Sequence, residues 1–313
     1  MNDKKEYSAF DLYKNDIETV PKLLDPFLQT VGLASLVGTS DSGKSTILRQ
    51  LALSIALGLD EFLGFKLNTK EKKVIYVSTE DDPISISPSI KKQINYYKSI
   101  NSVKEEDALK NLTFLFDNED IIDTLNKKLS VQNVDLIVID AFTDVFNKEI
   151  NANTQVRSFL NRYDNLAKKY RCLIVFLHHI GKRRDKINPS KDSIIGTQAF
   201  EAKMRVVLEL RPRGANDNEV DLWVLKSNFL QQSHKRKSYV LEFKDGAVFE
   251  NTNNRSGMSP DSKLNDTSII REVLQLQNEG KSVREIAEEL KKSSHNISKS
   301  TVHTIIKEHK TQE

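Results

Sequence analysis

Short runs of aliphatic and β-branched residues alternate with segments of helical periodicity along the chain up to about residue 250. Strands are predicted over residues 33–37, 74–78, 112–116, 136–139, 173–177, 206–210 and 222–225. Strands that alternate with helices are typical of βαβ units, in which the strands run parallel. The pattern therefore predicts an α/β fold with a mostly parallel central sheet.

Apolar residues at helical spacing mark the connections between these strands. Helices are predicted over residues 46–57, 118–129 and 154–170. After residue 238 the period changes to two on both sides of Asp245 and Gly246, a pair typical of a hairpin turn. We therefore expect a hairpin to complete the sheet near residue 250. The pattern of the first thirty residues is ambiguous, and Pro21 and Pro26 argue against one long helix there.

A polar segment, residues 251–268, separates the α/β part from a small C-terminal unit. Its sequence, NTNNRSGMSPDSKLNDTS, has almost no apolar residues, which is typical of a linker. Beyond it, helices are predicted over residues 269–279, 283–291 and 299–309. The predicted organisation is an N-terminal extension (1–30), an α/β domain (31–250), a linker (251–268) and an all-α domain (269–313).

Composition narrows the class of protein. The 313 residues are 38% hydrophobic and 29% charged, as in globular proteins. The net charge of +3 neither requires nor excludes nucleic acid as a partner. Cys172 is the single cysteine, which excludes an intrachain disulfide and a thiolate zinc cluster. No apolar run reaches the roughly 18 residues of a membrane span and the N-terminus is polar, so a cytoplasmic location is expected.

The chain contains a phosphate-binding motif between its first predicted strand and helix. The sequence GTSDSGKS matches G-x-x-x-x-G-K-[ST], in the context that the motif requires. Two glycines let consecutive backbone N–H groups point at phosphate oxygens, and the helix dipole adds to the attraction. Lys44 would neutralise the β- and γ-phosphates, and Ser45 would bind Mg²⁺. The predicted nucleotide site consists of Gly38, Thr39, Ser40, Asp41, Ser42, Gly43, Lys44, Ser45 and Thr46.

Acidic residues follow two other predicted strands. Asp140 ends the apolar run LIVID, as expected of a carboxylate that supports the metal. Glu80 follows VIYVST and could orient and deprotonate the water that attacks the γ-phosphate. For Asp81 and Asp82, which precede Pro83, helix capping is the preferred interpretation.

Two histidines, His178 and His179, follow the strand LIVFL. A zinc site is disfavoured because neither cysteine nor a suitably spaced carboxylate lies nearby. We expect one of these histidines to hydrogen-bond the γ-phosphate or the attacking water instead.

The segments GTSDSGKST, VIYVSTEDD, DLIVIDAF and LIVFLHHIGK, in this order, resemble the motifs of RecA-like ATPases. Within these ATPases they look most like the branch with the RepA-type plasmid replication helicases, over about residues 30 to 230. The resemblance implies that Glu80 is the catalytic base, that Asp140 supports Mg²⁺ and that His178 or His179 senses the nucleotide. It also implies a homo-hexamer or another ring, with ATP at the subunit interfaces.

The same resemblance places a cation that reaches into the neighbouring subunit at Lys226. The family usually carries an Arg two residues later, where this chain has Asn228. An amide cannot supply the charge that stabilises a phosphoryl transition state. Arg205, Arg211 or Arg213 could substitute, or each could be an ordinary surface residue.

Two segments are candidates for contact with DNA. In RecA-like proteins, loops after the sensor histidine touch single-stranded DNA, which would give Lys182, Arg183 and Arg184 that role. A solvated loop is the alternative. The tail resembles a helix-turn-helix, and Lys299, Ser300 and Thr301 would face a DNA groove. Its turn is several residues longer than usual, so a protein-docking module is an alternative interpretation of the tail.

The sequence therefore predicts an oligomeric, Mg²⁺-dependent ATPase that acts on DNA. A replicative helicase or DNA-remodelling motor of a plasmid, phage or mobile element agrees best with these features. The alternative is a nucleotide-switched DNA-binding or regulatory protein that does not translocate.

Overall fold

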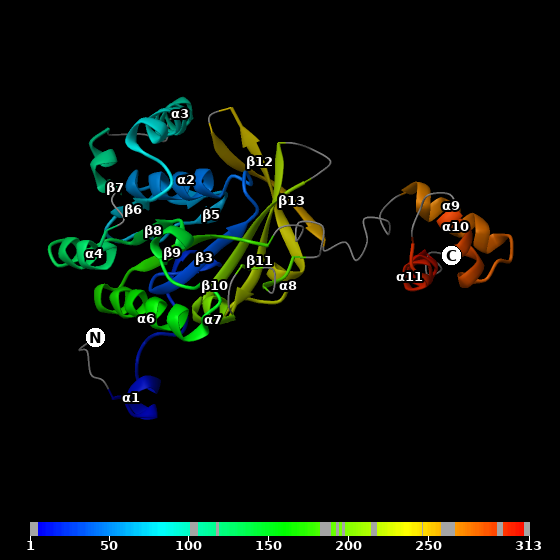
Figure 1. Ribbon diagram of the computed structural model, residues 1–313, viewed down its shortest axis with the longest axis horizontal. Coiled ribbons are helices and arrows are strands. Elements are labelled where there is room, and N and C mark those ends of the chain that lie inside the picture. Colours follow the sequence, from blue (N-terminus) through cyan, green and yellow to red (C-terminus); the bar gives the residue numbers. More distant parts are fainter. Residues whose placement is uncertain are drawn as a thin grey trace. The chain divides into compact units, whose positions relative to one another are not determined.

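The computed structural model describes residues 6–100, 106–116, 119–181, 189–191, 194–195, 198–213, 218–245, 247–257, 267–292 and 297–309. The chain divides into two compact units, Met1–Ser256 and Gly257–Glu313 (Figure 1). The first unit carries the sheet and the phosphate-binding motif, and the second is helical.

A nine-stranded sheet forms the centre of the first unit, in the order β13-β12-β11-β10-β3-β9-β8-β6-β7. Its strands are β3 (Gly32–Gly38), β6 (Val74–Ser78), β7 (Leu112–Leu115), β8 (Leu136–Asp140), β9 (Leu173–His179), β10 (Val206–Pro212), β11 (Glu219–Ser227), β12 (Lys237–Lys244) and β13 (Val248–Gly257). The strands from β10 to β7 in this order are parallel, and β11 is antiparallel to both β10 and β12. Every predicted strand and the predicted hairpin are present.

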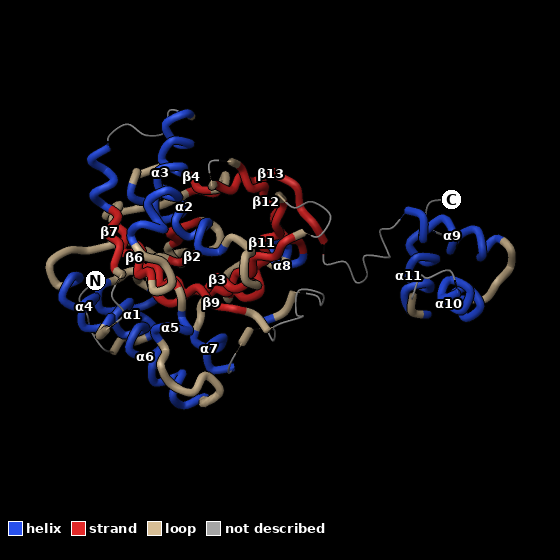
Figure 2. Tube along the Cα trace, turned by 45° about the horizontal axis from the view of Figure 1, so that its top comes forward, coloured by secondary structure: helices blue, strands red, loops and turns tan. Residues whose placement is uncertain are grey.

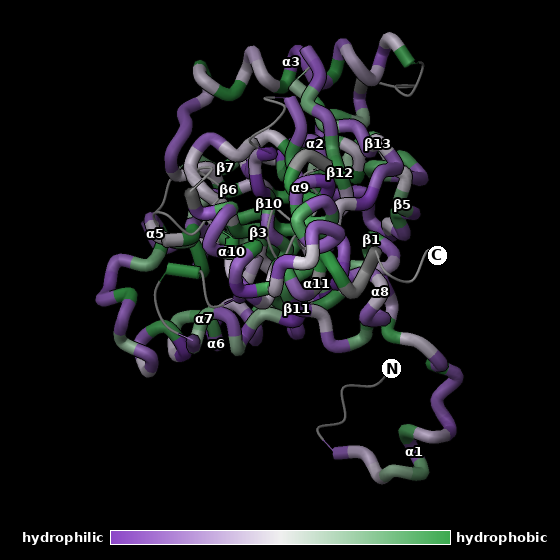
Figure 3. The backbone as a smooth tube through the Cα atoms, turned by 90° about the vertical axis from the view of Figure 1, so that its right-hand side faces the viewer, coloured by the Kyte–Doolittle hydropathy of each residue, from purple (hydrophilic) through white to green (hydrophobic). Residues whose placement is uncertain are grey.

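Helices cover both faces of this sheet (Figure 2). On one face lie α2 (Lys44–Ala56) and α3 (Pro83–Ser99), and on the other lie α4 (Ile121–Leu129), α5 (Phe142–Val145), α6 (Asn153–Tyr170) and α7 (Gln198–Lys203). Each layer packs a separate apolar cluster against the sheet. Helix α3 was not predicted, because it contains Pro88 and buries only Ile86, Gln93 and Tyr97, so that hydrophilic positions are mixed with the hydrophobic ones along its length (Figure 3). Among the described residues, no helix is long and apolar enough to cross a membrane.

The predicted N-terminal extension is partly wrong. Helix α1 (Ala9–Tyr13) buries no residue, but β1 (Lys22–Leu24) and β2 (Leu28–Gln29) belong to the main core. The ring of Phe27 packs edge-on against Phe65 and Tyr239, at centroid distances of 4.7 and 5.2 Å. These partners are far away in sequence, so the local pattern could not reveal the contact. Phe65 itself belongs to a small hairpin of β4 (Glu61–Phe62) and β5 (Phe65–Lys66).

The predicted linker begins too early. Residues 251–257 continue β13, because their polar side chains find partners on the sheet. Thr252 donates to the carbonyl oxygen of Val240 at 2.9 Å, and the Arg255 guanidinium lies 3.7 Å from the centre of the Tyr239 ring. Residues 251–257 of the predicted linker therefore belong to the sheet, and residues 258–266 lie outside the described residues.

The second unit contains α9 (Thr267–Asn278), α10 (Val283–Lys292) and α11 (Lys299–His309). Their apolar faces meet in a core of their own, which includes Ile269, Val273, Leu290, Val302 and Ile305. The positions agree with the predicted helices within two residues.

Candidate active site

The phosphate-binding loop joins the carboxyl end of β3 to the amino end of α2, as the motif requires. Gly43, the residue before α2, has φ = 85°, in the left-handed region that favours glycine. At Gly38 a Cβ atom would overlap the carbonyl oxygen of Leu210 on β10. Both glycines are therefore required by the backbone, one by its conformation and the other by a close approach.

Lys44 folds back over this loop. Its Nζ donates to the carbonyl oxygen of Thr39 at 2.5 Å and lies 3.4 Å from Ser42 Oγ. The residue is only 5% exposed, and burial lowers the pKa of its ammonium group, while the charges of Asp140, Glu80 and Asp41 oppose that shift. The lysine thus sits inside the loop with its charge directed at the space that the loop encloses.

Asp140 ends β8 and is 2% exposed. Its Oδ2 accepts a hydrogen bond of 2.5 Å from the hydroxyl of Tyr76, whereas its buried Oδ1 has no hydrogen-bond partner among the described residues. Burial raises the pKa of the carboxyl group, and hydrogen bonding by Tyr76 and Ser45 opposes that rise. One free, buried carboxylate oxygen close to a serine hydroxyl fits a divalent metal with oxygen ligands.

Glu80 and His179 meet at the carboxyl ends of β6 and β9. Glu80 Oε1 lies 3.8 Å from His179 Nε2, and the Glu80 side chain is 49% exposed. Desolvation and the nearby charges of Asp140 and Asp144 raise the pKa of Glu80, while His179 lowers it. A half-exposed carboxylate with a raised pKa can accept a proton from water.

His178 lies on the other side of the strand. Successive residues of a strand point to opposite faces, so only one of the two histidines can face the loop. The His178 ring is buried between Phe142 and Phe200, at centroid distances of 4.9 and 4.6 Å, and its Nε2 lies 2.8 Å from the carbonyl oxygen of Ile195. Burial lowers its pKa to about 4, so this histidine is neutral at pH 7. The structure favours His179 at the site.

The acidic residues after Glu80 have separate roles. Asp82 caps α3 and accepts a 2.7 Å hydrogen bond from the backbone of Ser85, as predicted. The capping prediction for Asp81 is wrong, because its carboxylate pairs with the buried Arg49 of α2 at 3.3 Å. Sequence reasoning missed both Arg49 and Tyr76, since Arg49 lies outside the motif segments and Tyr76 looks like an ordinary strand residue within VIYVSTEDD.

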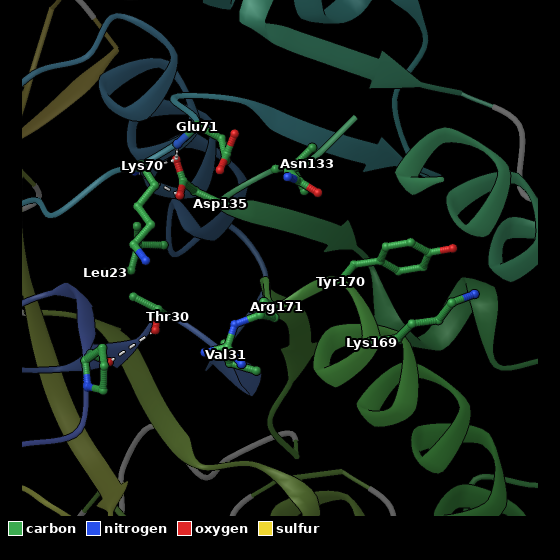
Figure 4. Close-up of a pocket in the computed structure, with 12 residues that line it drawn as sticks. Leu23, Thr30, Val31, Lys70, Glu71, Asn133, Asp135, Lys169, Tyr170 and Arg171 are labelled. Carbon is green, nitrogen blue, oxygen red and sulfur yellow. Dashed lines mark hydrogen bonds between the residues drawn. The ribbon is translucent and has the colours of Figure 1, made fainter. Parts of the chain in front are cut away.

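A pocket of about 270 Å³, drawn in Figure 4, lies at the opposite edge of the sheet. Its walls come from β1 and the segment before it, and from the segments just before β3, β6, β8 and β9, at the amino ends of these parallel strands. There Asp135 accepts backbone hydrogen bonds from Lys70, Glu71 and Lys72 (Figure 4 shows Asp135 beside Lys70 and Glu71). This carboxylate therefore holds a loop in place, and the pocket is separate from the phosphate site.

A family model described as an AAA domain matches residues 3–185. The chain belongs to this AAA-domain family. Among curated proteins none matches the chain. A solved structure described as an ATPase domain has a TM-score of 0.53 and 12% identity over 72% of this chain and 86% of that chain. This likeness confirms the predicted RecA-like fold. The family match shows that the protein is a nucleotide-dependent ATPase.

In this AAA-domain protein, Lys226 lies far from the phosphate loop of its own chain. Lys226 lies opposite Val207 of β10, and Val207 lies opposite Ser35 of β3. Ser35 is near the middle of β3, whereas the phosphate-binding loop follows the carboxyl end of that strand. Lys226 Nζ donates to the carbonyl oxygen of Glu201 at 2.8 Å and lies 3.0 Å from Glu201 Oε1. Of the other candidates, Arg205 is exposed, Arg211 pairs with Glu209 at 2.6 Å and Arg213 lies 3.4 Å from Asp221.

The candidate DNA contacts are only partly visible. Lys182, Arg183 and Arg184 lie outside the described residues. On α11, Lys299 and Ser300 are exposed. Thr301 is only 5% exposed and its Oγ1 lies 2.7 Å from Ser298 Oγ, so it belongs to the helix cap and does not face a groove. The prediction for Thr301 is therefore wrong, because the first turn of α11 directs it inward.

Proposed function

We propose that the protein is a Mg²⁺-dependent ATPase that acts on DNA as a homo-oligomeric motor, such as a replicative helicase of a plasmid, phage or mobile element. The observation that carries the ATPase part is the placement of Lys44, Asp140 and Glu80 around one phosphate-binding loop. The order of the motifs along the chain supports the helicase-like part.

Each residue of this site has a distinct task. Ser45 and Asp140 would hold Mg²⁺, and the bound ion would neutralise charge on the phosphate oxygens. Lys44 would bind the β- and γ-phosphates. Glu80 would take the proton from the attacking water, and His179, 3.8 Å away, would report the presence of the γ-phosphate to β9.

The sites for partners are proposed on separate surfaces. Lys226 would leave Glu201 and reach the nucleotide of a neighbouring subunit, because it cannot serve its own site. Lys182, Arg183 and Arg184 would contact single-stranded DNA. The helical unit, through Lys299 and Ser300, would add duplex binding.

ATPase and strand-unwinding assays, with and without single-stranded DNA, test this function, and mass photometry with nucleotide reports the assembly. We expect DNA-stimulated ATP hydrolysis, unwinding and a ring-sized particle. ATP-dependent assembly and DNA binding without unwinding would support the nucleotide-switched alternative. No ATP hydrolysis under any condition would contradict the proposal.

A further inference from the structure

The β12–β13 hairpin is fixed against the phosphate-binding loop. A Cβ atom at Gly43 would lie 2.5 Å from Cζ of Phe249, so this ring covers the loop. The Gln50 side chain of α2 donates to the Phe249 carbonyl oxygen at 2.9 Å and accepts from the Phe249 backbone N–H at 2.8 Å. The hairpin tip lies beside α2 and α3 in Figure 1. Loop and hairpin therefore form one rigid wall.

Gln93 of α3 bridges the hairpin turn and one end of the phosphate-binding loop. Its Nε2 donates to the carbonyl oxygen of Thr46 at 3.1 Å and to that of Ala247 in the hairpin turn at 2.8 Å. Thr46 is the last residue of the phosphate-binding set. The hairpin turn therefore lies beside the Thr46 end of the phosphate-binding set.

Phe243 is the exposed aromatic residue of this hairpin. Its ring centre lies 5.3 Å from that of Phe249, but Phe243 is 38% exposed where Phe249 is 3% exposed. Its backbone N–H donates to the carbonyl oxygen of Asn218 at 2.7 Å, just beyond the pair Glu219 and Glu242. The end of β11 next to Asn218 pairs with the end of β10 that lies beside Gly38. Phe243 therefore lies at the edge of the sheet that carries the phosphate-binding loop.

We propose that Phe243 is the stacking platform for the base of the bound nucleotide. The inference rests on the proposed ATPase function and adds the residue that recognises the nucleoside. Phe249 is too buried to meet a ligand, but its ring packs against the Phe243 ring in an edge-on contact. Aromatic rings stack on any base, so this platform would favour nucleoside triphosphates over inorganic polyphosphates without distinguishing ATP from GTP.

Equilibrium binding of ATP, GTP and inorganic tripolyphosphate to full-length variants tests the platform. Phe243→Ala should weaken both nucleotides roughly 5- to 100-fold, the range of base–aromatic stacking, and leave tripolyphosphate unchanged. Phe243→Tyr should restore nucleotide binding. The matched control is Phe229→Ala. Phe229 is 59% exposed and follows β11, and the last residues of β11 pair with the end of β10 that is far from the phosphate-binding loop. This variant should bind all three ligands as the wild type does.

A second variant gives a direct signal. Trp223 is the single tryptophan and is 3% exposed, so wild-type fluorescence should change little on binding. In Phe243→Trp, ATP should quench the new indole and tripolyphosphate should not. Unchanged ATP affinity in Phe243→Ala, or equal loss of ATP and tripolyphosphate, would overturn the platform while the ATPase stands. If the wild type binds no nucleotide, the proposed function itself fails, and the platform with it.

Discussion

The hydroxyl of Tyr76 holds one oxygen of Asp140 and leaves the other free for a metal. Tyr76→Phe should remove a hydrogen bond that lowers the pKa of Asp140, so the carboxyl group would bind protons more readily and metal less readily. We expect the Mg²⁺ concentration for half-maximal ATP hydrolysis to rise roughly tenfold. A Mg²⁺ titration of the rate measures this, and an unchanged midpoint would exclude Tyr76 as a positioning residue.

Lys44 is the cation that lies inside the phosphate loop of the described structure. Lys44→Ala should abolish ATP hydrolysis and strongly weaken nucleotide binding, because the phosphates would lose that side-chain charge. Calorimetry with ATP and a turnover assay check both effects. Retained turnover in the purified variant would refute the site.

Glu80 should behave differently, because a general base acts on water and not on the nucleotide. Glu80→Gln should reduce hydrolysis by orders of magnitude and preserve ATP binding. In the wild type, the base works when deprotonated, and its pKa is raised above 4.5. The rate should therefore fall as the pH drops through that raised pKa, and a pH–rate profile shows it. Loss of ATP affinity in Glu80→Gln with an unchanged rate per bound nucleotide would place the base elsewhere.

At the scale of elements, the clamp between α2 and β13 depends on one side chain. Gln50→Ala would leave the backbone N–H and C=O of Phe249 unpaired in a buried place. We expect the free energy of unfolding of the first unit to fall by about 2 kcal/mol, measured by urea denaturation. Gln155→Ala, at an exposed position of α6, is the matched control and should change it little. Equal stabilities of the two variants would mean that the clamp contributes nothing.

The strands were predictable because their aliphatic runs are buried on both faces, as in Leu136 to Ile139. The positions of the phosphate loop, Glu80 and Asp140 were predictable, because phosphate binding requires the fixed glycine and lysine spacing of the loop and the two carboxylates follow apolar strands. What the sequence could not show depends on distant partners. The sequence of residues 251–257 is typical of a linker, and only the fold shows that Asn251 donates to the carbonyl oxygen of Leu63. Likewise, Tyr76 looks like an ordinary strand residue in the sequence, and only the pairing of β6 with β8 places it beside Asp140.

At the scale of the whole molecule, the corrected end of β13 changes where the chain can be divided. A stop codon after Gly257 should leave a folded ATPase, whereas one after Glu250 removes the strand residues that bind Val240 and Tyr239 and should lower stability. The first truncation should keep turnover and its stimulation by single strands but lose affinity for duplex DNA. Gel shifts decide this, and equal duplex affinity with the full-length chain would make the helical unit a protein-docking element.

Shared sites between subunits can be tested by mixing. Lys226→Ala should bind ATP normally and hydrolyse it poorly, since it retains its own phosphate loop. Mixed with Lys44→Ala subunits, it should regain partial activity at hybrid interfaces. Turnover measured across mixing ratios checks this prediction, and no recovery at any ratio would contradict a neighbour-reaching role for Lys226.

The contact between Gln50 and Phe249 joins positions 199 residues apart. On a ribosome that adds roughly 5 to 20 residues per second, the glycine-rich loop would leave the exit tunnel about 10 to 40 seconds before its covering strand. During that interval the nascent chain exposes the apolar face of α2 that Phe249 later helps to cover. Because Phe249 packs on Gly43 and pairs with Gln50, we expect the loop to gain its full support only when the last strand of the sheet has been made, and a chain that stalls before Phe249 should bind nucleotide poorly.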